Sequence, residues 1–150
     1  MRSAALPLMA ALLLASPAHA ARPAQWSKLA SDGAGTLYVD KASVARVEHA
    51  AAVAAPDPGP GDARKAWTLV SYHKPQTSAD GKTYRSLKAQ YLYSCKDHSV
   101  TLLAQTFYPA TMARGEAVGN FKYEQYDAET PAAGSHTDNA YQYVCSRKLR

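Results

Sequence analysis

The motif Tyr-x-Tyr-x-Cys occurs twice in this chain, at residues 91–95 and 141–145, and the two copies hold its only cysteines. Side chains alternate faces along an extended strand, so both rings and the sulfur of each copy would project from one side. Two such strands can be joined by a disulfide. We therefore predict that Cys95 and Cys145 are bonded between two strands of one antiparallel sheet, with at least one tyrosine of each copy in the core.

The first twenty residues have the three parts of a secretory signal peptide. Arg2 gives a charged start, an apolar run covers residues 4–15, and Ala18, His19 and Ala20 form a small-x-small end. The apolar run is too short for a membrane-spanning helix, which needs about 20 residues. We expect residues 1–20 to be removed, and residues 21–150 to form one exported domain without a transmembrane segment.

Export favours a disulfide, because thiols oxidise in the periplasm and outside the cell. With two cysteines there is one intramolecular pairing, and an intermolecular bond is the alternative. A redox-active pair would normally be close in sequence, as in Cys-x-x-Cys. We therefore interpret Cys95 and Cys145 as a structural bond.

The remaining pattern predicts an α+β fold, a single antiparallel meander with a short flanking helix. Asp40 is a candidate cap for a helical turn, residues 45–55 are compatible with a helix followed by a strand, and Pro75 should end a strand. Residues 129–139 should form a loop. The expected strands are 26–29, 36–39, 66–73, 84–95, 99–108, 121–126 and 140–145, with Leu87, Ala89, Tyr91 and Tyr93 on a buried face and Ser86, Lys88, Gln90 and Ser94 on a wet one.

The chain lacks familiar catalytic and metal-binding motifs, so we expect no enzyme, no catalytic residues and no metal site. It has no Gly-x-Ser-x-Gly, His-Glu-x-x-His or phosphate-binding glycine loop, and its histidines lack compact metal-ligand spacing. The formal net charge is +5, but the basic residues are scattered along the chain and mixed with acidic ones. This distribution argues against nucleic acid as a partner. His73 and His98 are the candidates for the alternative function, a periplasmic small-ligand or haem-binding protein.

Ten tyrosines against two phenylalanines suggest either a half-buried core edge or a recognition surface. Tyrosine and tryptophan dominate many binding sites because they offer large contact areas with a polar tip. The candidate binding residues are the tyrosines of the two motif copies: Tyr91, Tyr93, Tyr141 and Tyr143.

Ordered short motifs between residues 26 and 145 resemble the surface-adhesin protein E family. They are Leu37-Tyr38-Val39-Asp40 with Ser43, Trp67-Thr68-Leu69-Val70 with Tyr72, Lys74, Pro75 and Gln76, Ser86-Leu87-Lys88 before Tyr93-Ser94-Cys95, and Pro131 with Ser135 before Cys145. The chain departs from the family pattern in having no lipid-anchor cysteine, a Pro/Gly-rich stretch at 56–61 and Tyr126 at a position where tryptophan is frequent.

The resemblance implies a small antiparallel sheet flanked by a helix, exported to the periplasm, cell surface or medium of a Gram-negative bacterium. It also implies a non-enzymatic binding protein whose partner is an extracellular-matrix, plasma or cell-envelope protein, such as laminin, vitronectin or plasminogen. Haem binding is associated with the same family, and a homodimer is an alternative assembly. The resemblance supplies no set of binding residues.

Overall fold

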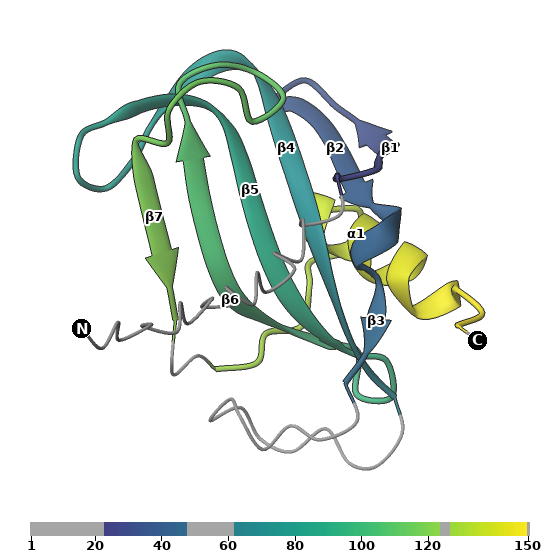
Figure 1. Ribbon diagram of the computed structural model, residues 1–150. Helices are drawn as coiled ribbons and strands as arrows, with labels where there is room; N and C mark the ends of the chain where they lie inside the picture. Colours follow the sequence, from purple (N-terminus) through teal and green to yellow (C-terminus); the bar gives the residue numbers. More distant parts are fainter. Residues whose placement is uncertain (1–22, 48–61, 124–126, 150) are drawn as a thin grey trace, which may run out of the picture.

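The computed structural model describes residues 23–47, 62–123 and 127–149 (Figure 1). The predicted signal peptide, most of the ambiguous segment 45–55, the Pro/Gly-rich stretch 56–61 and Tyr126 lie outside these residues. The described part has one antiparallel sheet and one α-helix, which confirms the predicted fold class.

The sheet has seven strands in the order β1-β2-β4-β5-β6-β7, with the short β3 paired to the start of β4. Every pairing is antiparallel, and Figure 1 shows the strands as one twisted layer with β7 at the edge. The strands are β1 (Trp26–Ser31), β2 (Gly35–Asp40), β3 (Ala45–Arg46), β4 (Ala63–Thr77), β5 (Thr83–Ser94), β6 (Ser99–Tyr108) and β7 (Gly119–Lys122).

Two aspartates shape the first hairpin and the turn after it, and one of them, Asp40, is the cap that the sequence predicts. The carboxylate of Asp32 accepts hydrogen bonds from the amides of Ala34 and Gly35 in the turn between β1 and β2. Asp40 accepts from the amide of Ala42 at 3.0 Å and thereby caps the 3₁₀ turn η1 (Lys41–Ser43). Short polar side chains thus replace the backbone partners that these turns lack.

The prediction that Pro75 ends a strand is wrong, because β4 runs through it to Thr77. Proline cannot donate a ladder hydrogen bond, so inside a sheet it occurs at edges and irregularities. The pairing of β4 with β5 shifts register between Ser71 and Gln76, and Pro75 lies within that shift. The irregular stretch therefore accommodates Pro75 without ending the strand.

The predicted last strand at 140–145 is wrong, because these residues belong to helix α1 (His136–Ser146). The side chain of Ser135 caps the helix by accepting from the Asp138 amide at 3.1 Å, and Gly134 precedes it with φ of 74°. Alternation of apolar residues over 141–145 resembled a strand, yet Ala140 and Val144 are four apart and share a helical face. The flanking helix thus lies at the C-terminal end, and residues 45–46 form a strand.

Helix α1 covers one face of the sheet and lies behind β2 and β4 in Figure 1. We call this the inner face and the opposite one the outer face. Tyr93 and Val39 are completely buried, and Leu37 is 2% exposed. Burying apolar side chains between a sheet and a helix provides the main stabilisation of such a domain. The core members are Leu37, Val39, Ala66, Tyr93, Val100, Ala140, Tyr141 and Val144.

The predicted wet face of β5 is wrong for Ser86 and Ser94, which are both buried. The segment after β6 folds over Ser86, whose hydroxyl donates to the Ala110 carbonyl at 2.6 Å and accepts from the Ala113 amide at 2.9 Å. A buried hydroxyl needs such partners. The loop that supplies them follows β6, so local alternation in β5 could not reveal it.

The Cys95–Cys145 disulfide is present within the chain, with Cα atoms 5.5 Å apart, which confirms the predicted intramolecular bond. Its geometry differs from the prediction, since it joins the end of β5 to helix α1 instead of two strands. The Tyr141 hydroxyl donates to the Cys95 carbonyl at 2.8 Å beside it. Tyr93 and Tyr141 confirm the prediction of one core tyrosine in each motif copy.

A buried arginine holds the C-terminal end of α1 to β4. The Arg64 guanidinium donates to the carbonyls of Val144 at 2.6 Å and Arg147 at 2.8 Å, and Asp62 lies 3.4 Å from it. The last carbonyls of a helix have no partners inside the helix. Arg64 therefore satisfies α1 with charge-assisted hydrogen bonds, which are stronger than neutral ones.

Replacing both cysteines by serine should lower the free energy of unfolding by roughly 4 kcal/mol, because the bond closes a loop of 50 residues. Urea unfolding of the mature double variant against the oxidised parent measures this. A loss below about 1 kcal/mol would contradict a stabilising role for the bond.

Arg64→Leu should cost about 3 kcal/mol, since it removes two charge-assisted hydrogen bonds and leaves buried carbonyls without donors. Arg46→Leu is the matched control, because Arg46 pairs with Arg64 in the register of β3 and β4 but is exposed. Chemical unfolding of both variants measures how much free energy of unfolding each substitution removes. Equal losses would show that Arg64 contributes no more than a surface arginine.

Candidate binding surface

Five aromatic rings form a continuous row from β4 to the edge of the sheet. Ring centroids lie 5.8 Å apart for Tyr72 and Tyr84, 4.8 Å for Tyr84 and Phe107, 5.8 Å for Phe107 and Phe121, and 6.4 Å for Phe121 and Tyr123. The first three pairs are edge-to-face and the last is stacked, which are the favoured arrangements of aromatic pairs. We call these five residues the aromatic row.

The sheet register and one glycine create the outer end of this row. Gly119 pairs with Phe107, and Phe121 pairs with Gln105 on the same face. A Cβ atom on Gly119 would lie 3.1 Å from the Phe121 ring and 3.4 Å from the Phe107 ring, so any larger residue would push the rings apart. Phe121 is 40% exposed and is the one large hydrophobic residue exposed among the residues that the structure describes.

A small notch lies between helix α1 and the sheet, beside the inner end of the row. It offers about 30 Å³ to solvent, room for one or two water molecules. Tyr91 belongs both to the notch and to the surroundings of Tyr72, whose ionisation it disfavours. The lining residues are Leu37, Thr68, Val70, Leu87, Ala89, Tyr91, His136, Thr137 and Ala140.

Burial keeps the phenols of Tyr72, Tyr84 and Tyr91 protonated over the physiological pH range by raising the pKa of each. Burial, and then the neighbouring Tyr84, raise the pKa of Tyr72 to about 12. Burial also raises the pKa of Tyr91 and of Tyr93. These phenol rings are therefore neutral and aromatic, which suits contact with another surface.

Two histidine–aspartate contacts position the start of α1 beside the notch. His136 Nε2 lies 3.1 Å from an Asp32 carboxylate oxygen, and His98 Nε2 lies 3.6 Å from one of Asp138. The hydrogen bond from the Gly134 amide is the main reason why the pKa of Asp138 is lowered. These contacts connect the first turn of the helix to the loops after β1 and β5.

The four tyrosines predicted as binding residues do not share an exposed face. Tyr93 is fully buried and Tyr141 is 6% exposed, so both are core residues. Tyr91 is half-buried in the notch, and the half-buried Tyr143 lies on α1 with Arg147 over its ring at 5.4 Å. A binding role for all four tyrosines stays a prediction, with Tyr93 and Tyr141 placed in the core.

The sequence pattern did not reveal the aromatic row, although it predicted each strand that carries one of the five rings. Phe107, Phe121 and Tyr123 become neighbours only when β6 pairs with β7. An available signal was the spacing of Gly119, Phe121 and Tyr123, which puts a glycine and two rings on one face of an extended segment.

The histidines named for haem binding are not members of the aromatic row. His98 stacks on Tyr141 at 4.4 Å between ring centroids, while His73 is exposed near the far end of β4. Within residues 23–47, 62–123 and 127–149, no group of three or more His, Cys, Asp or Glu side chains could hold a metal ion. A helix long and apolar enough to span a membrane is likewise not found in that part of the chain.

The fold and this surface define a small disulfide-bonded domain with one helix on a seven-stranded sheet and an aromatic inner face. The model of the family described as "Surface-adhesin protein E" matches residues 26–146. The chain therefore belongs to the surface-adhesin protein E family, an assignment that implies an adhesin-like protein at the cell surface or secreted.

Solved structures of Haemophilus influenzae protein E are similar in fold. One matches with a TM-score of 0.57 and 15% identity, covering 87% of this chain and 94% of that one. Another matches with a TM-score of 0.54 and 16% identity, covering 87% and 90%. A comparison with curated protein sequences found no match.

Tyr93→Phe should leave stability at pH 7 unchanged or slightly higher, because the buried Tyr93 hydroxyl has no hydrogen-bond partner in the structure. The parent should lose stability as the pH rises above about 10. There the unfolded chain ionises its tyrosines, whereas burial raises the pKa of Tyr93 and Tyr72 in the folded state. The Tyr93→Phe variant should lose less stability than the parent over the same rise in pH.

Urea unfolding of parent and variant from pH 7 to 11 measures this difference. Tyr38→Phe is the control, since Tyr38 is half-buried on the outer face. An alkaline loss as steep in Tyr93→Phe as in the parent would show that Tyr93 does not cause it.

Proposed function

We propose that this protein is a non-enzymatic binding module that contacts another protein through the aromatic row. The observation that carries the proposal is the unbroken chain of ring contacts from the half-buried Tyr72 to the exposed Phe121. Membership of an adhesin family supports the same reading. The partner is a protein of the extracellular matrix, the plasma or the cell envelope.

An aromatic surface of this kind suits protein contact for an energetic reason. Aromatic side chains are enriched among the few interface residues that supply most of the binding free energy. The rings here are held by one another and by the sheet, so little side-chain entropy is lost on binding. The edge position of β7 leaves Phe121 accessible from outside the sheet (Figure 1).

The adjoining notch adds a place for a single small apolar group. Its floor is formed by side chains of β2, β4 and β5, and its wall by the first turns of α1. At about 30 Å³ it is too small for a haem or another large cofactor, but a partner side chain could rest against it. Tyr91 would then contact the partner, as the sequence predicts.

Phe121→Ala should weaken binding of the mature protein to its partner about thirtyfold, the effect of losing about 2 kcal/mol at a central aromatic contact. Laminin, vitronectin and plasminogen are the first partners to measure, by biolayer interferometry on immobilised protein. Asn120→Ala is the matched control, because Asn120 is the exposed neighbour in β7 and projects from the other face.

Equal affinities for Phe121→Ala and Asn120→Ala would show that the row is not the contact surface. Saturable binding of none of the three proteins, nor of any protein in envelope extracts, would count against the binding module itself. Sedimentation of the mature protein separates a third case, in which a second copy of the chain occupies the row.

A further inference from the structure

The outer face of the sheet, opposite α1 and the aromatic row, carries lysines in three neighbouring rows of paired residues. Lys28, Tyr38, Leu69 and Lys88 are consecutive partners across β1, β2, β4 and β5. The same row continues through Thr106 and Asn120 to the far edge of the sheet. It crosses six strands, which corresponds to about 24 Å at the usual strand spacing.

A second row lies two residues away on the same face and ends at another lysine. Trp67 pairs with Gln90, Gln90 with Ala104, and Ala104 with Lys122. Lys65 follows on β4, again two residues along. Four lysines, Lys28, Lys65, Lys88 and Lys122, thus project from the outer face.

Within the strands that the structure describes, acidic side chains do not balance these lysines. Asp40 is the only acidic residue in the seven described strands, and its carboxylate already accepts from the amides of Gln25 and Ala42. Within the described residues, none of the four lysines forms an ion pair. Lys28, Lys65 and Lys122 are exposed, and Lys88 Nζ lies 4.5 Å from the centre of the Trp67 ring.

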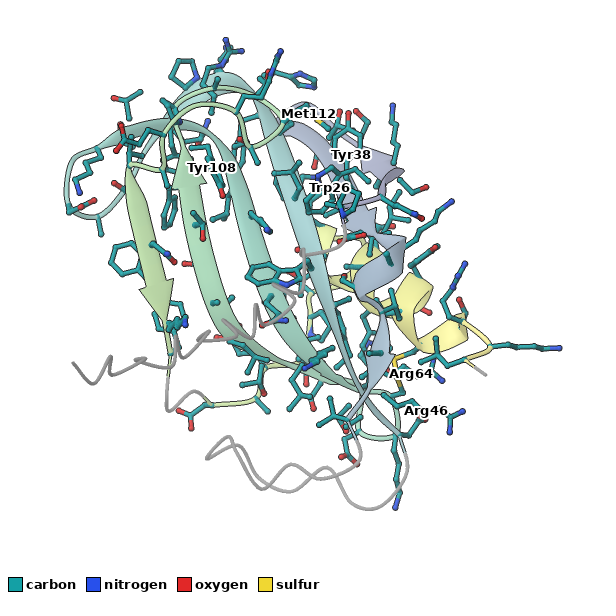
Figure 2. The ribbon with its side chains drawn as sticks, viewed as in Figure 1. Trp26, Tyr38, Arg46, Arg64, Tyr108 and Met112 are labelled. Atoms are coloured by element: carbon teal, nitrogen blue, oxygen red, sulfur yellow. A yellow bond between two sulfur atoms is a disulfide. The ribbon has the colours of Figure 1, made fainter. Side chains whose placement is uncertain are left out.

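We infer from this arrangement that the outer face binds a sulfated polysaccharide chain. Lysine ammonium groups bind sulfate as exposed point charges. The half-buried rings of Trp26, Tyr38 and Trp67 offer surfaces for sugar rings between them. Figure 2 labels Trp26 on β1 and Tyr38 on β2. Lys28 on β1 and Lys122 on β7 lie on the two outermost strands of the sheet, about 24 Å apart across it. Cations spread over this distance fit an extended polyanion better than a compact ligand.

A lipid bilayer fits this face less well. The aliphatic side chains of the outer face are buried, with Leu69 completely inaccessible and Leu92 5% exposed, so they cannot enter a bilayer. Thr106, Gln90 and the exposed Asn120 instead provide hydrogen-bonding groups for hydroxyls.

Heparin oligosaccharide is the probe, titrated into mature protein that carries Trp26→Phe, so that Trp67 is the sole tryptophan. Heparin should change Trp67 emission with saturation, and binding should weaken as salt rises. Adding Lys28→Ala and Lys122→Ala should raise the dissociation constant roughly 3- to 30-fold, the range for two exposed ion pairs. Lys74→Ala with Lys96→Ala removes the same charge from other exposed sites and should change it less than twofold.

The inference would be overturned by equal weakening in both double variants, by undiminished binding of fully desulfated heparin, or by tighter binding of anionic phospholipid vesicles or DNA than of heparin. Failure to bind heparin at low salt would do the same. Because Phe121 projects from the inner face, heparin binding should be unchanged by Phe121→Ala, which separates this site from the aromatic row.

Discussion

The attachment of helix α1 to the sheet is the constraint on which the rest of the structure depends. A disulfide to Cys145 and two hydrogen bonds from Arg64 hold the C-terminal part of the helix. Contacts of His136 and Asp138 hold its start. One helix attached at both ends buries the inner face over β2 and β4.

The same attachment leaves part of the inner face uncovered, and the candidate binding surface lies there. A single helix covers only a strip of a sheet six strands wide, and the core cluster has no member from β7. Rings in mutual contact occupy the remainder, where each buries part of its neighbour. The same aromatic side chains shield this part of the sheet from water and form the proposed recognition surface.

The two faces of the sheet differ in chemistry because each strand alternates. On β7, Phe121 projects to the inner face while Asn120 and Lys122 project to the outer one. The domain can therefore offer a neutral aromatic surface on one side and a cationic one on the other. Two partners of unlike chemistry could occupy them without competing for the same residues.

Local chemistry in the sequence determined much of the fold: the first hairpin with its aspartate caps, the limits of β6, and the pairing of the only two cysteines. Only the tertiary structure decided that residues 140–145 are helical, since their short apolar alternation is compatible with either element and packing against β2 and β4 selects the helix. Likewise Ser86, Phe107 and Phe121 acquired their surroundings from strands and loops distant in sequence. Local patterns are set by neighbours along the chain, whereas burial and contact surfaces depend on which segments meet in space.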